Sequence, residues 1–238
     1  MNTAPETKHK GGFTLLELLI VISIMAILSV ALVFILNPAE TLKKSRDAQR
    51  ISDLSTLKTA IGLYLTSTTT PALGELYTGA GTGNVACKAS PTAAYASGDK
   101  IFYSLDSGSA ITDTLLDGSV SASVPAALQV AAAALPLTDG TGWIPVMFDN
   151  LTSGSPISNL PIDPVNTIAA LNAVASTDLV YRYACSANNT TFEIDAQLES
   201  IAYTSTDNKL TTDGGNASLY YEVGTNLKIL GTGASIPF

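Results

Sequence analysis

The sequence predicts an α+β protein in which one long amino-terminal helix packs against a carboxy-terminal antiparallel sheet. Two observations lead to this fold class. Residues 13–67 read as an apolar run followed by an amphipathic stretch, interrupted only at Asn37-Pro38. Strand-like alternation of apolar and polar residues is clearest near the carboxyl end, in residues 179–198. A helix-first, sheet-last order of this kind favours one helix lying on one sheet.

Residues 13–36 form an apolar run of 24 residues with one ionisable side chain, Glu17. At about 1.5 Å per residue the helix is roughly 36 Å long, enough to cross a hydrocarbon core of about 30 Å. A buried core helix is the alternative, and it is disfavoured because the run is apolar on every side. Hydroxyls at Thr14, Ser23 and Ser29 can bond to carbonyls of the preceding turn. A carboxylate in a membrane helix makes Glu17 a candidate functional residue.

The amino-terminal sequence KGGFTLLELLIVISIMAIL resembles the class III signal of type IV prepilins and type II secretion pseudopilins. The resemblance is specific over the first quarter of the chain and architectural beyond it. It implies the type IV pilin-like fold. It also implies that prepilin peptidase cuts between Gly12 and Phe13 and methylates the new amino terminus of Phe13. Glu17 falls at the fifth mature position, where the family has a glutamate.

The resemblance implies a structural subunit of a type IV pilus or a type II secretion pseudopilus. Its implied partners are prepilin peptidase, a platform membrane protein, a cytoplasmic assembly ATPase, inner-membrane lipid before assembly, and further copies of the chain. The filament would lie at the cell surface or in the periplasm. The alternative is a low-copy minor pilin or an anchored adhesive protein, suggested by the long segment 71–161. The expected parts are a cleaved leader (1–12), a membrane and filament-core helix (13–36), its amphipathic continuation (37–67) and an extracytoplasmic head (68–238).

Glu17 is assigned a role in assembly by helix geometry. After cleavage the Phe13 amine lies four residues before Glu17, about 6 Å away along the helix axis. In a filament, the Phe13 amine of a neighbouring copy could pair with this carboxylate. Because the surroundings are apolar, an unpaired partner would cost several kcal/mol. The pair is therefore expected to act on the register of packed helices.

The second half of the helix is predicted to be amphipathic. Pro38 predicts a kink or short break, since it lacks an amide N–H. The helix should end near Thr66, before the polar run that leads to Pro71. An apolar stripe with spacings of three and four contains Ile51, Leu54, Leu57, Ile61 and Tyr64. The solvent-facing side is predicted to hold Lys43, Lys44, Arg46, Asp47, Arg50 and Asp53.

Residues 179–184 and 191–198 predict a β-hairpin around a turn at Ser186–Asn189. A second strand pair is predicted over residues 218–223 and 227–230. The apolar face of the hairpin is expected to hold Tyr181, Tyr183 and Cys185 from one strand, and Phe192, Ile194 and Ala196 from the other.

The middle of the chain carries weaker signals. Residues 101–105 predict a strand, and Ala126–Leu135 predicts a short alanine-rich helix. Trp143–Val146 has the apolar side chains to fill a core. Leu160–Asn166 resembles the LPxDPxN segment of G-type pseudopilins, and its two prolines predict an extended turn.

The two cysteines, Cys87 and Cys185, are expected to form one disulfide because the leader implies export to an oxidising compartment. Two buried thiols are the alternative. The bridge would close a loop of roughly 100 residues, which stabilises a fold by up to about 4–5 kcal/mol in the chain-entropy view.

Composition and motifs argue against catalysis and nucleic-acid binding. From Ile61 onward the chain has five basic and fifteen acidic residues, so a general basic face is not expected. The only histidine, His9, lies in the leader, which leaves no His-based catalytic site or zinc site in the mature chain. The acidic residues, Asp163 and Glu193 among them, are scattered. We therefore expect no enzyme activity, no cofactor and no metal, with one open alternative. Oxygen-rich residues 207–216 would suit Ca²⁺, as in the calcium loop of G-type pseudopilins, or form plain turns.

Overall fold

The computed structural model describes residues 11–74, 87–88, 90, 100–105, 112–113, 132–169, 173–187 and 190–230. It divides into two compact units, residues 1–42 and residues 43–238. The helices are α1 (Leu15–Leu36) and α2 (Pro38–Ser67), and the strands are β1 (Phe102–Tyr103), β2 (Thr112–Asp113), β3 (Ala173–Val174), β4 (Tyr181–Ser186), β5 (Thr191–Ala196) and β6 (Tyr221–Gly224).

Helix α1 is apolar on every side. Each of its side chains whose placement is described is exposed. One helical stretch in the described part of the chain, which contains α1, is long and apolar enough to cross a membrane. The helix ends at Leu36 because Asn37 takes a left-handed conformation, with φ 38° and ψ 70°. Pro38 then begins α2, where its fixed φ suits a first helical position. The predicted break at Asn37-Pro38 is confirmed.

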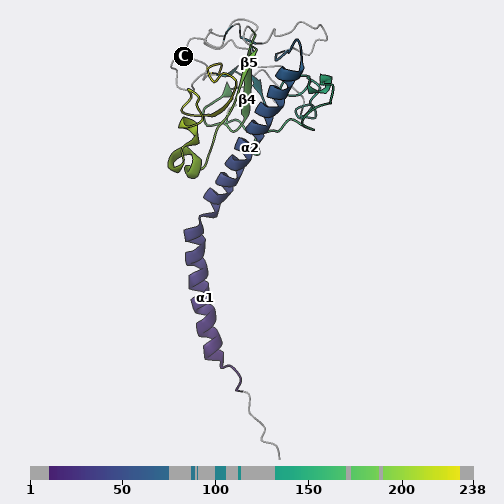
Figure 1. The fold of residues 1–238 in the computed structure, drawn as a ribbon. Coiled ribbons are helices and arrows are strands. Elements are labelled where there is room, and N and C mark those ends of the chain that lie inside the picture. The colour runs from purple at the N-terminus through teal and green to yellow at the C-terminus, as the bar shows by residue number, and fades with distance from the viewer. Residues whose placement is uncertain are drawn as a thin grey trace, which may run out of the picture. The chain divides into compact units, whose positions relative to one another are not determined.

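In the second unit, α2 packs on a four-stranded antiparallel sheet with strand order β1-β4-β5-β6 (Figure 1). Strands β4 and β5 form the predicted hairpin, with Tyr181 opposite Ala196 and Ser186 opposite Thr191. The predicted apolar face is confirmed, because its six residues all join the main core. Strands β2 and β3 form a separate parallel pair.

The apolar stripe of α2 is confirmed in the same core. Ile51 is only half-buried, whereas Ala60 is buried with the stripe. Trp143 is fully buried and its indole Nε1 donates to the carbonyl of Pro161 over 2.8 Å. The predicted core role of Trp143–Val146 is therefore confirmed. The fully buried members of the stripe are Leu54, Leu57 and Ile61, with Tyr64 nearly so.

Three local predictions need correction or fall outside the structure. The strand predicted over 101–105 is reduced to β1. The first part of Ala126–Leu135 lies outside the described residues, and residues 132–135 form a turn. Residues 227–230 are not a strand. Instead of pairing with a neighbouring strand, the backbone N–H groups of Ile229 and Leu230 donate to the Glu193 carboxylate.

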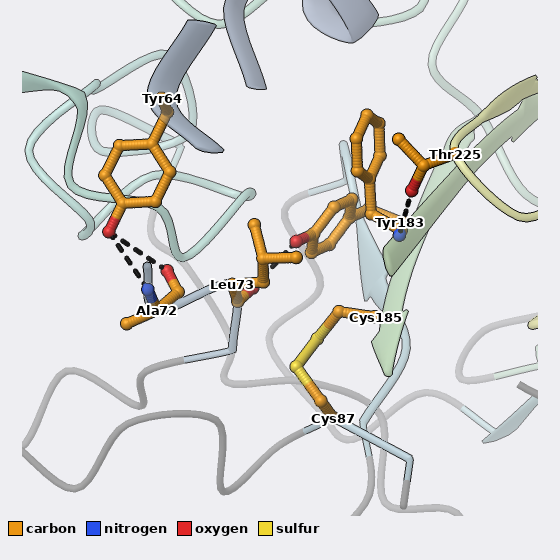
Figure 2. Close-up of a disulfide and its surroundings, with 8 residues drawn as sticks. Tyr64, Ala72, Leu73, Cys87, Tyr183, Cys185 and Thr225 are labelled. Atoms are coloured by element: carbon orange, nitrogen blue, oxygen red, sulfur yellow. Dashed lines mark hydrogen bonds between the residues drawn. A yellow bond between two sulfur atoms is a disulfide. The ribbon is translucent and has the colours of Figure 1, made fainter. Parts of the chain in front are cut away.

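The predicted disulfide between Cys87 and Cys185 is present, with the two Cα atoms 4.7 Å apart (Figure 2). Beside it, the Tyr183 hydroxyl donates to the carbonyl of Leu73 over 2.7 Å. Gly74 lies so close that a Cβ there would stand 2.5 Å from the Cys87 sulfur. The bridge therefore packs the segment after α2 against the central strand β4, at a point where only glycine fits.

Replacing both cysteines by serine should lower the free energy of unfolding by about 4–5 kcal/mol, because the bridge closes a long loop in the unfolded chain. We would measure this by denaturant unfolding of the full chain in detergent micelles, using the fluorescence of the only tryptophan, Trp143. Wild-type protein reduced with dithiothreitol should match the C87S/C185S variant. An unchanged unfolding midpoint in both would contradict the prediction.

Candidate functional site

The residues of the predicted cleavage site precede α1. Gly11, Gly12 and Phe13 are exposed and carry no regular secondary structure. A Cβ built on either glycine would meet nothing within 4 Å. Thr14 has an extended conformation, with φ −76° and ψ 151°, and caps α1. The peptide bond between Gly12 and Phe13 thus lies in an exposed segment that precedes the helix and its Thr14 cap.

Glu17 and Thr14 form a capping box at the start of α1. The Thr14 backbone N–H donates to Glu17 Oε2 over 2.9 Å, and the Thr14 hydroxyl donates to the same oxygen over 2.9 Å. In return, the Glu17 N–H donates to the Thr14 hydroxyl over 3.2 Å. The carboxylate therefore satisfies a backbone donor of the first turn, where negative charge is also favoured by the helix dipole.

The expectation that the Thr14 hydroxyl bonds to a carbonyl of the preceding turn is wrong, because Thr14 precedes α1 and its hydroxyl donates to Glu17 instead. A threonine followed three residues later by glutamate is the usual sequence signal of this cap. The hydroxyls of Ser23 and Ser29 behave as expected. They donate to the carbonyls of Ile20 and Met25 over 2.8 and 2.7 Å. Along α1 the polar groups of these side chains are thus satisfied within the helix, as an apolar surrounding requires.

A second cluster attaches α2 to the rest of the head. It consists of Arg50 with the three carboxylates that it contacts, and we call it the Arg50 clamp. The guanidinium bonds to Asp163 through two nitrogens, at 2.6 and 3.0 Å. A third nitrogen donates to Asp47 and to Glu199, each over 2.8 Å. The side chains of Arg50, Asp47 and Asp163 are fully buried.

The clamp corrects the prediction that Asp47 and Arg50 face solvent. Both are buried because their partners come from distant parts of the chain. Asp47 also accepts the N–H groups of Glu199 and Ser200, the latter over 2.7 Å. Asp163 likewise accepts the N–H groups of Val165 and Asn166 in its own turn. The turn predicted from the two prolines is thus present, and it positions the Asp163 carboxylate to bind Arg50 of α2.

Glu199 joins the clamp to a second arginine. Arg46 donates to both Glu199 oxygens, over 2.6 and 2.8 Å. The Arg46 hydrogen bond and the Arg50 guanidinium lower the pKa of Glu199 to about 2. The carboxylate therefore stays ionised in the folded head at any pH in which the protein is expected to function. Through Arg46, Asp47 and Arg50, one turn of α2 is thereby hydrogen-bonded to residues 199–200 and to Asp163.

The other candidate residues are not gathered into a site. Asp163 belongs to the clamp, whereas Glu193 lies on β5 and bonds to Ile229 and Leu230. In the loop considered for Ca²⁺, Asp213 accepts backbone N–H groups from Gly215 and Glu222. Within the described ranges, no three His, Cys, Asp or Glu side chains are grouped as metal ligands.

Residues 7–33 match the family described as the prokaryotic N-terminal methylation motif. The match spans the segment that contains Gly12, Phe13 and Glu17, and it confirms the resemblance expected there. No curated protein and no solved structure matches the chain.

Replacing Arg50 by alanine should destabilise the head by about 3–5 kcal/mol, because it leaves the Asp47 and Asp163 carboxylates buried without their cation. Arg46 is the matched control. Its side chain is 33% exposed, so Arg46→Ala should cost about 1 kcal/mol or less. Tryptophan-monitored denaturation of the full chain in micelles measures both. Equal losses for the two variants would show that burial of the Arg50 clamp is energetically unimportant.

Proposed function

We propose that this type IV pilin-like protein is a structural subunit of a helical filament, either a type IV pilus or a type II secretion pseudopilus. The observation that carries the proposal is the coincidence of the methylation motif at residues 7–33 with an entirely exposed apolar helix. The motif implies a precursor anchored in the membrane by α1 and processed by prepilin peptidase. Assembly on a platform protein, powered by a cytoplasmic ATPase, follows from the family resemblance.

The geometry before α1 supports processing at Gly12. A peptidase has to reach the bond that it cuts, and residues 11–13 are exposed and carry no regular secondary structure. Glycine on the amino side of the bond leaves room for the enzyme. Cleavage would make Phe13 the amino terminus, and methylation would retain its positive charge. The mature chain would then begin one residue before the Thr14 cap of α1.

The surface of α1 supports polymerisation. A soluble monomer rarely exposes contiguous apolar patches larger than a few hundred Å². Here the whole described length of α1 is exposed, with Leu15 at 82% and Ile35 at 79% of their full accessibility. Lipid can cover this surface before assembly, and α1 helices of other copies can cover it afterwards. The apolar surface of α1 that leaves the lipid on assembly is then buried again against the α1 helices of other copies.

Glu17 supports a defined register within such a bundle. In the precursor its carboxylate is occupied by Thr14. Cleavage places a free amine next to that cap, and a neighbouring subunit shifted along the axis can bring its own Phe13 amine to the same carboxylate. Because a carboxylate in apolar surroundings is costly without a cation, only registers that supply one are favoured.

The first prediction from this function concerns processing. When the chain is made together with a prepilin peptidase, its mature form should begin at Phe13 and carry one methyl group. Intact-mass spectrometry of assembled filaments measures this directly. Gly12→Leu should accumulate as precursor in the membrane, with Gly11→Ala as the control that is still processed. Filaments built from chains that retain residues 1–12 would contradict the proposal.

The second prediction concerns Glu17. Glu17→Ala should be inserted and cleaved normally but should reduce filament yield by at least about tenfold, the effect of losing an interaction worth about 1.4 kcal/mol or more. Glu17→Asp should be intermediate, since its carboxylate reaches less far. Thr14→Val removes the hydroxyl of the capping box but keeps the carboxylate, and it should assemble better than Glu17→Ala. Sheared filament from cells with each variant as the only copy gives the yield. Normal yield from Glu17→Ala would falsify the register role.

A further inference from the structure

The sheet face opposite α2 buries two glutamates from neighbouring strands. Glu193 on β5 is completely buried, and Glu222 on β6 is 1% exposed. They lie on the same face, since Glu222 pairs with Asp195 in the ladder and Asp195 is two residues from Glu193. Two carboxyl groups buried side by side are unusual, because each ionised form loses its hydration. Neither belongs to the Arg50 clamp or to the amino-terminal segment.

Each glutamate holds down a different part of the carboxy-terminal region. Glu193 Oε2 accepts the N–H groups of Ile229 and Leu230, over 2.7 and 2.8 Å. Glu222 Oε2 accepts the N–H group of Ala217 over 2.7 Å. Ile229 and Leu230 are fully buried and pack in a second apolar cluster with Ala184. The carboxylate of Glu193 therefore fastens residues 227–230 over this face of the sheet.

The remaining oxygen of Glu193 identifies the protonation state. Glu193 Oε1 is buried and receives no N–H or O–H group. The Glu193 side chain is also in hydrogen-bonding contact with the Glu222 side chain. Two ionised carboxylates have no hydrogen to share, so this contact is a hydrogen bond only when one of them carries a proton. The orphan oxygen is the natural site for that proton, with Glu222 as its acceptor.

The cations near the pair, Arg182 and Lys88, bond to the Asp195 carboxylate and to the carbonyl of Ile229, respectively. Arg182 on β4 bonds to both oxygens of Asp195, one of them over 2.8 Å, and stacks 3.9 Å from the ring of Tyr220. Lys88 donates to the carbonyl of Ile229 over 3.0 Å. Asp213, in the loop before β6, adds a third carboxylate near Glu222. The charged groups that face the pair are Asp195, Asp213, Arg182 and Lys88.

We propose that Glu193 and Glu222 share one proton, and that this proton is a pH-sensitive fastening of residues 227–230 to the sheet. Loss of the proton leaves two buried negative charges in contact. Their repulsion is relieved when Glu193 leaves Ile229 and Leu230 and reaches water, which detaches the segment. The device does not depend on filament assembly and would operate in a single head.

The raised pKa values of the pair keep a proton in place well above the pH at which an ordinary carboxyl group ionises. Burial, and then the contact with Glu222, raise the pKa of Glu193 well above its ordinary value. Burial raises the pKa of Glu222 to about 7. A group whose pKa is raised on folding stabilises the fold fully below its unfolded pKa, here about 4.3, and this contribution is lost as pH rises through the folded pKa. Attachment of residues 227–230 should therefore weaken as pH rises from about 4.3 towards the raised pKa of Glu193, the residue that holds the shared proton.

Hydrogen–deuterium exchange of the full chain in detergent micelles tests the proposal. After correction for base catalysis, the opening equilibrium of a peptide covering residues 227–230 should rise by up to about tenfold per pH unit between pH 5 and 7, since opening releases one proton. Glu193→Gln supplies a permanent N–H donor to Glu222 and keeps an oxygen for Ile229 and Leu230. Its opening equilibrium should be independent of pH.

Two further arms make the result decisive. Asp149→Asn changes an exposed acid outside this face and should keep the wild-type pH dependence. Glu222→Gln, which removes the second charge, should flatten the profile like Glu193→Gln, so the test survives if one variant folds poorly. A pH-independent wild type, or an unchanged slope in both glutamine variants, would overturn the proposal. Restored protection at pH 8 on adding CaCl₂ would also overturn it, by showing that the pair holds a cation.

Discussion

The buried guanidinium of Arg50 is the interaction on which the head most depends. It is surrounded by carboxylates from α2 itself, from the proline-flanked turn at Asp163 and from the segment after β5 at Glu199. A charge without exposure to water is tolerated only when its hydrogen bonds are complete. The three segments must therefore be in place together. Apolar contacts alone would let α2 slide along the sheet, whereas the bonds of Arg50 fix its position along its axis.

The two faces of the sheet are built on different chemistry as a consequence. The face under α2 is mostly apolar, and the helix is fixed to the head by the Arg50 clamp. The opposite face buries an arginine and three carboxylates, and it is closed by a short segment that forms no strand. On the first face, the position of α2 is set by one cation, Arg50, whose guanidinium bonds to three carboxylates. On the second face, the position of residues 227–230 is set by the hydrogen bonds that Glu193 makes with Glu222 and with the backbone.

Patterns of local origin could be predicted from the sequence. The stripe of α2 follows from helical periodicity, the hairpin β4–β5 from alternation around a polar turn, and the disulfide from two cysteines in an exported chain. The burial of Arg50 could not be predicted this way, because its partner Asp163 is 113 residues away and a helical wheel assigns charges to the solvent side. For the same reason residues 227–230 looked like a strand, since nothing local reveals that Glu193 takes their N–H groups. At the amino terminus, the apolar run and the family resemblance identify Glu17, and the spacing of Thr14 and Glu17 is the local signal for the capping bond between them.

The disulfide has a mechanical consequence. In the filament that we propose, tension pulls a subunit through its amino-terminal helix, and force that passes along α2 reaches the carboxyl end of that helix. From there the chain reaches Cys87, and the sulfur bridge carries the load directly to Cys185 in the central strand β4. The 98-residue separation between the two cysteines is thereby bypassed. Most of the segment 71–161 lies in this bypassed loop, so it can vary in length or shape without lengthening the covalent path that bears the force.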